Sequence, residues 1–186
     1  MSTETVTVAV PVPPRVAVRQ DGGRLVVEGP LGRVERRFPV GALSLEIRGA
    51  EAVLTLTLPP RRRASRALLR TWEAHLRNLV GGVTRGVEAK MKVVAAHFPM
   101  KVAVKGETLL IENFLGEKHP RSAPLLPGTR AQVEGEFVIL NGNDIEQIGQ
   151  SAANIERATR IREYDPRVFQ DGIYLIERAH LKEAAA

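Results

Sequence analysis

Residues 109–116 read LLIENFLG, and residues 25–32 read LVVEGPLG. In both stretches, Leu is followed by an apolar pair, Glu, two variable residues and Leu-Gly. The match extends on both sides, because RVAVRQDGGRLVVEGPLGRVERRFP (residues 15–39) corresponds to KVAVKGETLLIENFLGEKHPRSAP (residues 101–124). The chain therefore contains an internal duplication, although two strand-rich halves could also resemble each other by chance.

The rest of each half follows the same plan. Residues 53–58 alternate apolar and polar side chains, as a half-buried strand does, and residues 137–140 occupy the equivalent place. A helix is expected after each strand, with apolar stripes at helical spacing: Leu68, Trp72, Leu76, Leu79 and Val83, then Ile145, Ile148, Ala152 and Ile155. On the opposite face of the first helix, Glu73 and Arg77 are spaced to pair. The pattern predicts an α+β fold of two duplicated small domains, each an antiparallel or mixed sheet with one helix packed on one face.

Several local features follow from this alignment. The repeats align at an offset of 86 residues for Val16 and 84 residues for Leu25. We attribute the difference to a longer turn at residues 21–23 than at residues 105–107, since hairpin turns tolerate insertions. Residues 81–86 lack the Gly-Lys-Ser/Thr ending of a phosphate loop, and we expect a helix end there. Residues 141–144 are expected to form the turn and cap before the second helix.

The expected domain limits follow from the same pattern. Residues 1–14 are expected to be an N-terminal arm, residues 15–92 the first repeat, and residues 93–180 the second repeat. Residues 181–186 are expected to be a tail. The strand around residues 83–94 is assigned to the first repeat.

Composition restricts the function. The 186 residues carry 27 Lys and Arg against 21 Asp and Glu, for a net charge of +6, which favours nucleic acid or an anionic membrane surface as partner. Arg supplies most of this excess, and its planar guanidinium matches phosphate, although a codon or high-temperature bias would also enrich Arg. The absence of Cys excludes disulfides, thiolate zinc sites and iron–sulfur clusters. With no signal-peptide pattern and no apolar run of about 20 residues, we expect a cytoplasmic protein without a membrane partner.

Catalytic patterns are missing. The four His residues, at positions 75, 97, 119 and 180, have neither the spacing nor the adjacent Glu of a metalloprotease helix, and no Ser nucleophile elbow occurs. We therefore predict no enzymatic activity, no cofactor, no metal and no small-molecule substrate.

Basic residues form three clusters. Residues 1–92 have a net charge of +8 and residues 93–186 one of −2, so the second repeat needs a local cluster to bind a polyanion. The first cluster precedes and begins the first helix and contains Arg61, Arg62, Arg63, Arg66 and Arg70, which could lie along a phosphate backbone or be solvated. In the second, Lys90 and Lys92 alternate with Met91, so on a strand both would face outward while Met91 packs.

The third cluster follows the second helix. Arg157, Arg160, Arg162 and Arg167 lie at its end and in the next loop, before a turn that offers Gln170, Asp171 and Tyr174. A helix C-terminus stabilises one or two cations, but not four. Clustered Arg with polar and aromatic neighbours suits an irregular RNA surface, where phosphates and unstacked bases are both within reach.

Three segments carry a family resemblance. GQSAANIERATRIREYDPRVFQDGIYLIE, AKMKVVAAHFPMKV and LLIENFLGEKHPR closely resemble the sixth protein of the large ribosomal subunit, in its archaeal and eukaryotic branch. The resemblance covers nearly the whole chain and includes its duplication. RVFQDGIY is specific to that branch, since the bacterial branch has a Lys-Gly-rich sequence there.

This resemblance implies a structural, non-catalytic protein of the cytoplasmic ribosome. It implies binding to large-subunit rRNA near the sarcin–ricin loop, which translation factors approach, with other ribosomal proteins as neighbours. Carried over residue by residue, it implies RNA contacts from Arg157, Arg160, Arg167, Gln170, Asp171, Gly172 and Tyr174, and from Lys118, His119 and Arg121. Gly172 would permit close approach of the RNA backbone.

The sequence departs from the family in one stretch. Relatives are richer in aromatic residues where this chain has Val87, Ala89, Val93 and Ala95. Phosphate contacts from Lys90 and Lys92 are therefore expected there, rather than aromatic stacking. Two alternatives stay open: a free-standing protein-interaction module with exposed sheet edges, and a small enzyme that acts on an anionic substrate.

Overall fold

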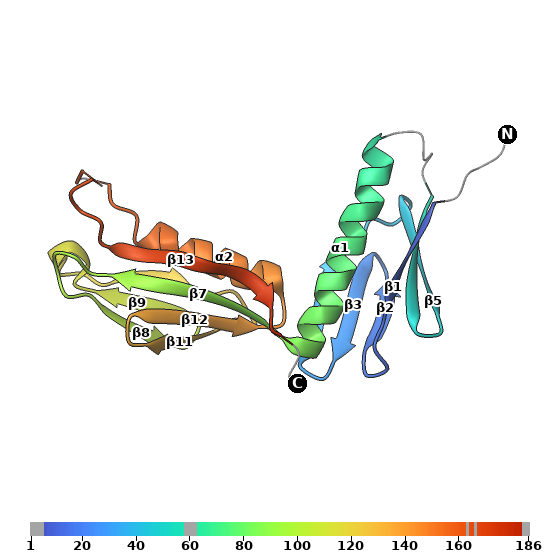
Figure 1. The fold of residues 1–186 in the computed structure, drawn as a ribbon, viewed down its shortest axis with the longest axis horizontal. Helices are drawn as coiled ribbons and strands as arrows, with labels where there is room; N and C mark the ends of the chain where they lie inside the picture. The colour runs from blue at the N-terminus through green and yellow to red at the C-terminus, as the bar shows by residue number, and fades with distance from the viewer. Residues whose placement is uncertain (1–5, 58–62, 163, 166, 184–186) are drawn as a thin grey trace. The chain divides into compact units, whose positions relative to one another are not determined.

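The computed structural model describes residues 6–57, 63–162, 164, 165 and 167–183 (Figure 1). The chain forms two compact units, residues 1–85 and residues 86–186. Each unit combines antiparallel strands with one α-helix, which confirms the predicted α+β class and the duplicated small domains.

The first unit contains two three-stranded sheets and helix α1. One sheet has the order β1-β6-β5, formed by Thr7–Pro11, Glu51–Leu56 and Leu43–Arg48. The other has the order β2-β3-β4, formed by Ala17–Asp21, Arg24–Gly29 and Gly32–Arg37. Helix α1 (Arg63–Arg85) packs against strands of both sheets.

The second unit repeats this plan and extends it. Its larger sheet has the order β11-β12-β7-β13, formed by Arg130–Glu134, Phe137–Gly142, Val87–Val94 and Gly172–Leu181. Its smaller sheet has the order β10-β9-β8, formed by Arg121–Pro124, Thr108–Glu112 and Lys101–Lys105. The second helix, α2, spans Ile145–Ala158, and a 3₁₀ turn, η1, spans Phe114–Gly116. The strand order β7-β12-β11 matches β1-β6-β5, so β13 is an addition to the repeat.

The repeated motif contributes the central strand of the sheet β2-β3-β4 in the first unit and of the sheet β10-β9-β8 in the second. Leu25 and Val27 of β3, and Leu109 and Ile111 of β9, are completely buried. Because these positions alternate along each strand, their side chains lie on one face of it and pack into the core. A duplicated strand pattern thus places the same apolar residues in the same part of two cores.

The helices use the predicted stripes. Trp72, Leu76, Leu79 and Val83 are buried in α1, and the expected Glu73–Arg77 ion pair forms at 2.9 Å. In α2, Ile148, Ala152 and Ile155 are buried. Asp144 caps α2, since its side chain accepts a hydrogen bond from the Glu146 backbone N–H at 2.9 Å.

Strand β7 corrects the predicted domain boundary. It pairs with β12 and β13, so it belongs to the second unit, and the boundary lies between residues 85 and 86 rather than between 92 and 93. In the same way, β1 opens the first unit by pairing with β6, so the expected arm at residues 1–14 contains a sheet strand. In each unit, the structural repeat therefore begins one strand before the segment in which the two sequences match.

The hairpin turns also differ from the prediction. In the first hairpin Asp21 pairs with Arg24, and in the second Lys105 pairs with Thr108, so both turns contain two residues. Ala17–Asp21 of β2 and Lys101–Lys105 of β8 pair with the same positions of β3 and β9, so the two hairpins correspond at an offset of 84 residues throughout and the offset of 86 is wrong. Helix α1 ends at Arg85, within the segment 81–86 where a helix end was expected, and Gly86 follows it with a positive φ of 81° that terminates the helix.

Gly29 allows the β3–β4 turn to pack closely against the end of α1. The Leu31 N–H donates to the Val83 carbonyl oxygen at 3.0 Å. A Cβ at Gly29 would lie 2.6 Å from Val83 Cγ2 and 2.9 Å from the Val83 carbonyl oxygen. The chain therefore needs glycine at this position for steric reasons.

We expect Gly29→Ala to lower the free energy of unfolding by about 1–3 kcal/mol, because the methyl group forces the turn away from α1. Chemical denaturation followed by circular dichroism measures this change. Gly149→Ala is the control, since its Cβ would meet open space on α2 and a helical Ala is favoured by about 0.5–1 kcal/mol. Equal effects of the two substitutions would contradict the close-packing explanation.

Candidate nucleic-acid interface

Two segments of the second unit have no counterpart in the first. The two-residue turn between β3 and β4 is replaced, between β9 and β10, by the longer loop 113–120. After α2, the chain continues through residues 159–171 into β13, whereas the first unit ends with α1. Most of the predicted RNA-facing residues of this unit lie in or beside these two segments.

Arg121 joins the two added segments. Its Nε and Nη2 donate to the Glu117 carboxylate at 2.8 and 2.5 Å, and its Nη1 donates to the carbonyl oxygens of Ala158 and Arg160 at 2.8 and 3.2 Å. The guanidinium also lies 4.2 Å from the centroid of the Phe114 ring. The hydrogen bond from Arg121 holds the pKa of Glu117 below its usual value, against a smaller opposing effect of burial. Arg121 therefore fixes the loop to the end of α2, and the RNA contact expected of it stays a prediction.

Asp171 holds the end of the second added segment. The residue is 2 % exposed; its Oδ1 accepts the His97 backbone N–H at 3.0 Å, and its Oδ2 lies 3.0 Å from His97 Nδ1. Burial raises the pKa of Asp171, but these hydrogen bonds, with another from the Ala96 backbone, outweigh burial and hold the pKa below its usual value. Asp171 thus points inward and positions the segment, while the RNA contact expected of it stays a prediction.

The end of α2 is fastened along the edge strand β13. The Ile173 N–H donates to Thr159 Oγ1 at 3.1 Å, and the Leu175 N–H donates to Glu156 Oε1 at 3.0 Å. These bonds satisfy two backbone donors that an edge strand would otherwise expose. They also fix the position of the last turn of α2 relative to β13.

The inward bonds leave four arginines on the surface, which we call the arginine segment: Arg157, Arg160, Arg162 and Arg167. None of their guanidinium groups forms an ion pair with an acidic residue in the described part of the chain. Their positions agree with the prediction of an exposed cationic cluster. Lys118 and His119 of the loop 113–120 are exposed as well.

Tyr174 lies beside the arginine segment at the start of β13. Its side chain is exposed, and its Oη donates to the Gln170 carbonyl oxygen at 3.1 Å. A Cβ at Gly172 would lie 3.0 Å from the Tyr174 ring, so Gly172 makes room for that ring. Gly172 is buried, and the close approach of an RNA backbone expected there stays a prediction. Gln170 remains exposed.

Strand β7 presents its two lysines outward, as predicted. Met91 is fully buried, whereas the Lys90 Nζ lies 4.4 Å from the centroid of the Phe137 ring and the Lys92 Nζ lies 4.0 Å from Glu136 Oε2. Val87 and Ala89 lie in the core. Those two positions face inward, so aromatic residues there would not offer stacking surfaces to a partner.

Several arginines of the first unit form ion pairs with glutamates. Arg61 and Arg62 lie outside the described residues, while Arg63, Arg66 and Arg70 follow the exposed side of α1. Glu73 accepts from Arg70 at 2.8 Å as well as from Arg77.

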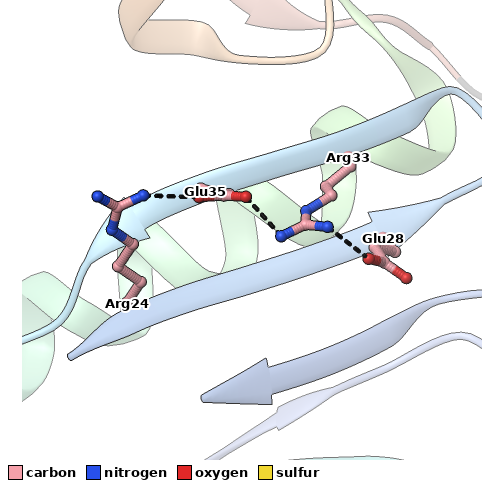
Figure 2. A network of polar contacts seen from close by, with 4 residues as sticks. All are labelled: Arg24, Glu28, Arg33 and Glu35. Carbon is pink, nitrogen blue, oxygen red and sulfur yellow. Dashed lines mark hydrogen bonds and ion pairs between the residues drawn. The ribbon is translucent and has the colours of Figure 1, made fainter. Parts of the chain in front are cut away.

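On the β3–β4 surface, Glu35 lies between Arg24 and Arg33, and Arg33 also reaches Glu28 (Figure 2). The hydrogen bond from Arg24 and the charge of Arg33 hold the pKa of Glu35 below its usual value. The two arginines and two glutamates of this network carry no net charge together.

Sequence reasoning missed three residues that position the site: Glu156, Thr159 and His97. Glu156 and Thr159 alternate with Arg157 and Arg160 in the sequence, but nothing in that spacing shows which side chains bond to β13. His97 and Asp171 are separated by 74 residues, so only the folded chain brings them together.

Known proteins resemble this chain over most of its length. A family model described as "Ribosomal protein L6" matches residues 98–172. Large ribosomal subunit protein uL6 of Methanospirillum hungatei is 47 % identical, over 94 % of this chain and 98 % of the relative. The proteins of the same name from Methanosarcina mazei and Ignicoccus hospitalis are 43 % and 45 % identical, over 93 % and 91 % of this chain and 96 % and 92 % of each relative.

The relatives that match are thus structural proteins of the ribosome rather than enzymes. The chain belongs to the ribosomal protein L6 family. None of the described helices is both long and apolar enough to cross a bilayer.

We expect Asp171→Asn to lower the free energy of unfolding by about 1.5–3 kcal/mol at pH 7, because a buried charged acceptor is lost. A folded-state pKa below the usual value means that the carboxylate stabilises the fold above about pH 4 and loses this effect as the pH falls through the folded-state pKa. The difference from wild type should therefore shrink below about pH 4 in denaturation experiments. Asp144→Asn is the control, since Asn also caps helices, and a pH-independent difference for Asp171→Asn would oppose the assignment.

We expect Arg121→Lys to destabilise the chain by about 1–3 kcal/mol, because one ammonium cannot reproduce the planar fork between Glu117 and two carbonyls. Thermal or chemical unfolding measures this change. The exposed Arg178→Lys should shift stability by less than about 0.5 kcal/mol. If Arg121→Lys is equally neutral, Arg121 does not hold the two segments together.

Proposed function

We propose that this chain is a constituent of the large ribosomal subunit and binds large-subunit rRNA through the arginine segment of its second unit. Members of the ribosomal protein L6 family are structural ribosomal components and not enzymes. We also propose that the contact lies near the translation-factor-binding site, in the region of the sarcin–ricin loop. In the cytoplasmic ribosome, other ribosomal proteins lie next to this contact, and translation factors bind close to it.

One observation carries the proposal: the two added segments are bonded to each other by Arg121, while the four arginines beside that junction have no acidic partner among the described residues. One arginine donates to carbonyl oxygens within the protein, and four others remain exposed. Such a surface is suited to bind an external polyanion. Lys118 and His119 can extend this surface from the loop 113–120.

The mechanism is electrostatic and architectural. Guanidinium groups that contact phosphates displace condensed counterions, which makes binding strongly dependent on salt. The hydrogen bonds of Asp171, Thr159 and Glu156 hold the two ends of the segment 159–171 before RNA arrives, so less conformational entropy is lost there on binding. Lys90 and Lys92 provide a second set of cations on β7.

The alternative, a module that recruits proteins through open sheet edges, is disfavoured at β13. Pairing with a partner strand there would require the backbone N–H groups of Ile173 and Leu175, which already donate to Thr159 and Glu156.

We expect Arg160→Ala with Arg167→Ala to weaken binding to a large-subunit rRNA fragment and to reduce the slope of log affinity against log salt by about 1.4–1.8, for two lost phosphate contacts. Filter binding across a salt series measures both effects, and circular dichroism checks the fold. Arg24→Ala with Arg48→Ala is the matched control, because it removes equal charge from exposed, ion-paired positions of the first unit.

Sedimentation and chemical probing complete this test. The wild-type chain should migrate with large subunits in a sucrose gradient and leave them at high salt. It should also protect the sarcin–ricin region from chemical probes. An unchanged slope for the Arg160/Arg167 variant, or migration away from subunits at low salt, would contradict the proposal.

A further inference from the structure

A groove lies between the end of α2 and the start of β13, on the same side as the arginine segment. It encloses about 550 Å³ and is lined, among others, by Arg157, Arg160 and Tyr174. Ile161 and Ile173 contribute apolar side chains to its lining. Two cations, an aromatic ring and an apolar lining therefore meet in one hollow.

The groove also contains a carboxylate, that of Glu156. A site built for phosphate alone would gain nothing from a negative charge beside its arginines, because like charges repel. A carboxylate is, however, a strong acceptor for the N–H groups on the edge of a base. One oxygen of Glu156 already accepts the Leu175 N–H, which keeps the side chain at this position.

Tyr174 supplies the surface that a planar ligand needs. The residue is 46 % exposed, its Oη donates a hydrogen bond to the Gln170 carbonyl oxygen, and its ring packs over Gly172. Unstacked bases of RNA are commonly received on aromatic rings and guanidinium planes, and each stacked base contributes about 1–3 kcal/mol. A fixed, half-exposed ring beside two arginines fits this mode of binding.

We propose that the groove receives one unstacked guanine base of RNA, with its ring on Tyr174, its N–H edge on Glu156 and its flanking phosphates on Arg157 and Arg160. Guanine is the base that offers two adjacent N–H donors to a carboxylate. The inference rests on the proposed function, since it names the part of the RNA that the second unit reads.

The substitution Glu156→Gln distinguishes a phosphate site from a guanine site by whether the affinity for RNA rises or falls. The amide oxygen of Gln can still accept the Leu175 N–H, so the fold is retained, while the negative charge is removed. If the groove binds only phosphate, this substitution raises the affinity for every RNA. If it binds guanine, the substitution lowers the affinity for guanine-containing RNA.

The experiment measures binding of the full chain to a uridine hexanucleotide and to the same hexanucleotide with one central guanosine, by fluorescence anisotropy. Wild type should prefer the guanosine strand by about 5-fold to 100-fold. Glu156→Gln and Tyr174→Leu should each remove most of that preference, while the exposed Glu177→Gln, farther along β13, should not. Circular dichroism of each variant verifies folding.

The outcomes separate this inference from the proposed function. Binding to large-subunit rRNA without a guanosine preference, or tighter binding of both hexanucleotides by Glu156→Gln, would overturn the guanine site and leave the proposed function standing. A guanosine preference without binding to large-subunit rRNA would support the site and overturn the proposed function.

Discussion

The buried carboxylate of Asp171 is the constraint on which the candidate interface depends. It holds the residues before β13 against the backbone of residues 96 and 97, so the long segment after α2 has a fixed end. Thr159 and Glu156 fix the other end to β13, and Arg121 fixes the loop 113–120 to the same place. The exposed arginines therefore lie on or beside a segment whose two ends are held by inward hydrogen bonds.

The duplication separates scaffold from interface. The two units share strand order, buried central strands and a covering helix, and the second unit differs mainly by two added segments. Those segments are bonded to each other through Arg121. The first unit, in contrast, contains no Lys, and pairs several of its arginines with Glu28, Glu35 and Glu73. Total charge is thus a poor guide to the interface, because several arginines of the more basic unit are paired with glutamates.

Local patterns predicted much of the fold. Apolar side chains alternate along the strands that contain Leu25 and Leu109, and they recur at helical spacing from Trp72 to Val83. In these elements, residue spacing alone predicts which side chains are buried. The domain boundary required long-range information, since β7 joins the second unit only by pairing with strands that follow much later in the chain. The exposed arginines were predictable as a cluster. Sequence could not show that Arg121 and Asp171 point inward, because an inward and an outward polar side chain look the same in a sequence.

The central claim is that Arg121 is occupied inside the protein while the arginine segment is left free for RNA. Arginine-selective dicarbonyl modification, read by mass spectrometry on the free protein and on assembled large subunits, tests it most directly. The account predicts that Arg157, Arg160, Arg162 and Arg167 react rapidly in the free protein and are protected in the subunit, while Arg121 reacts slowly in both. Rapid modification of Arg121 in the free protein, or four arginines that stay reactive in the subunit, would contradict it.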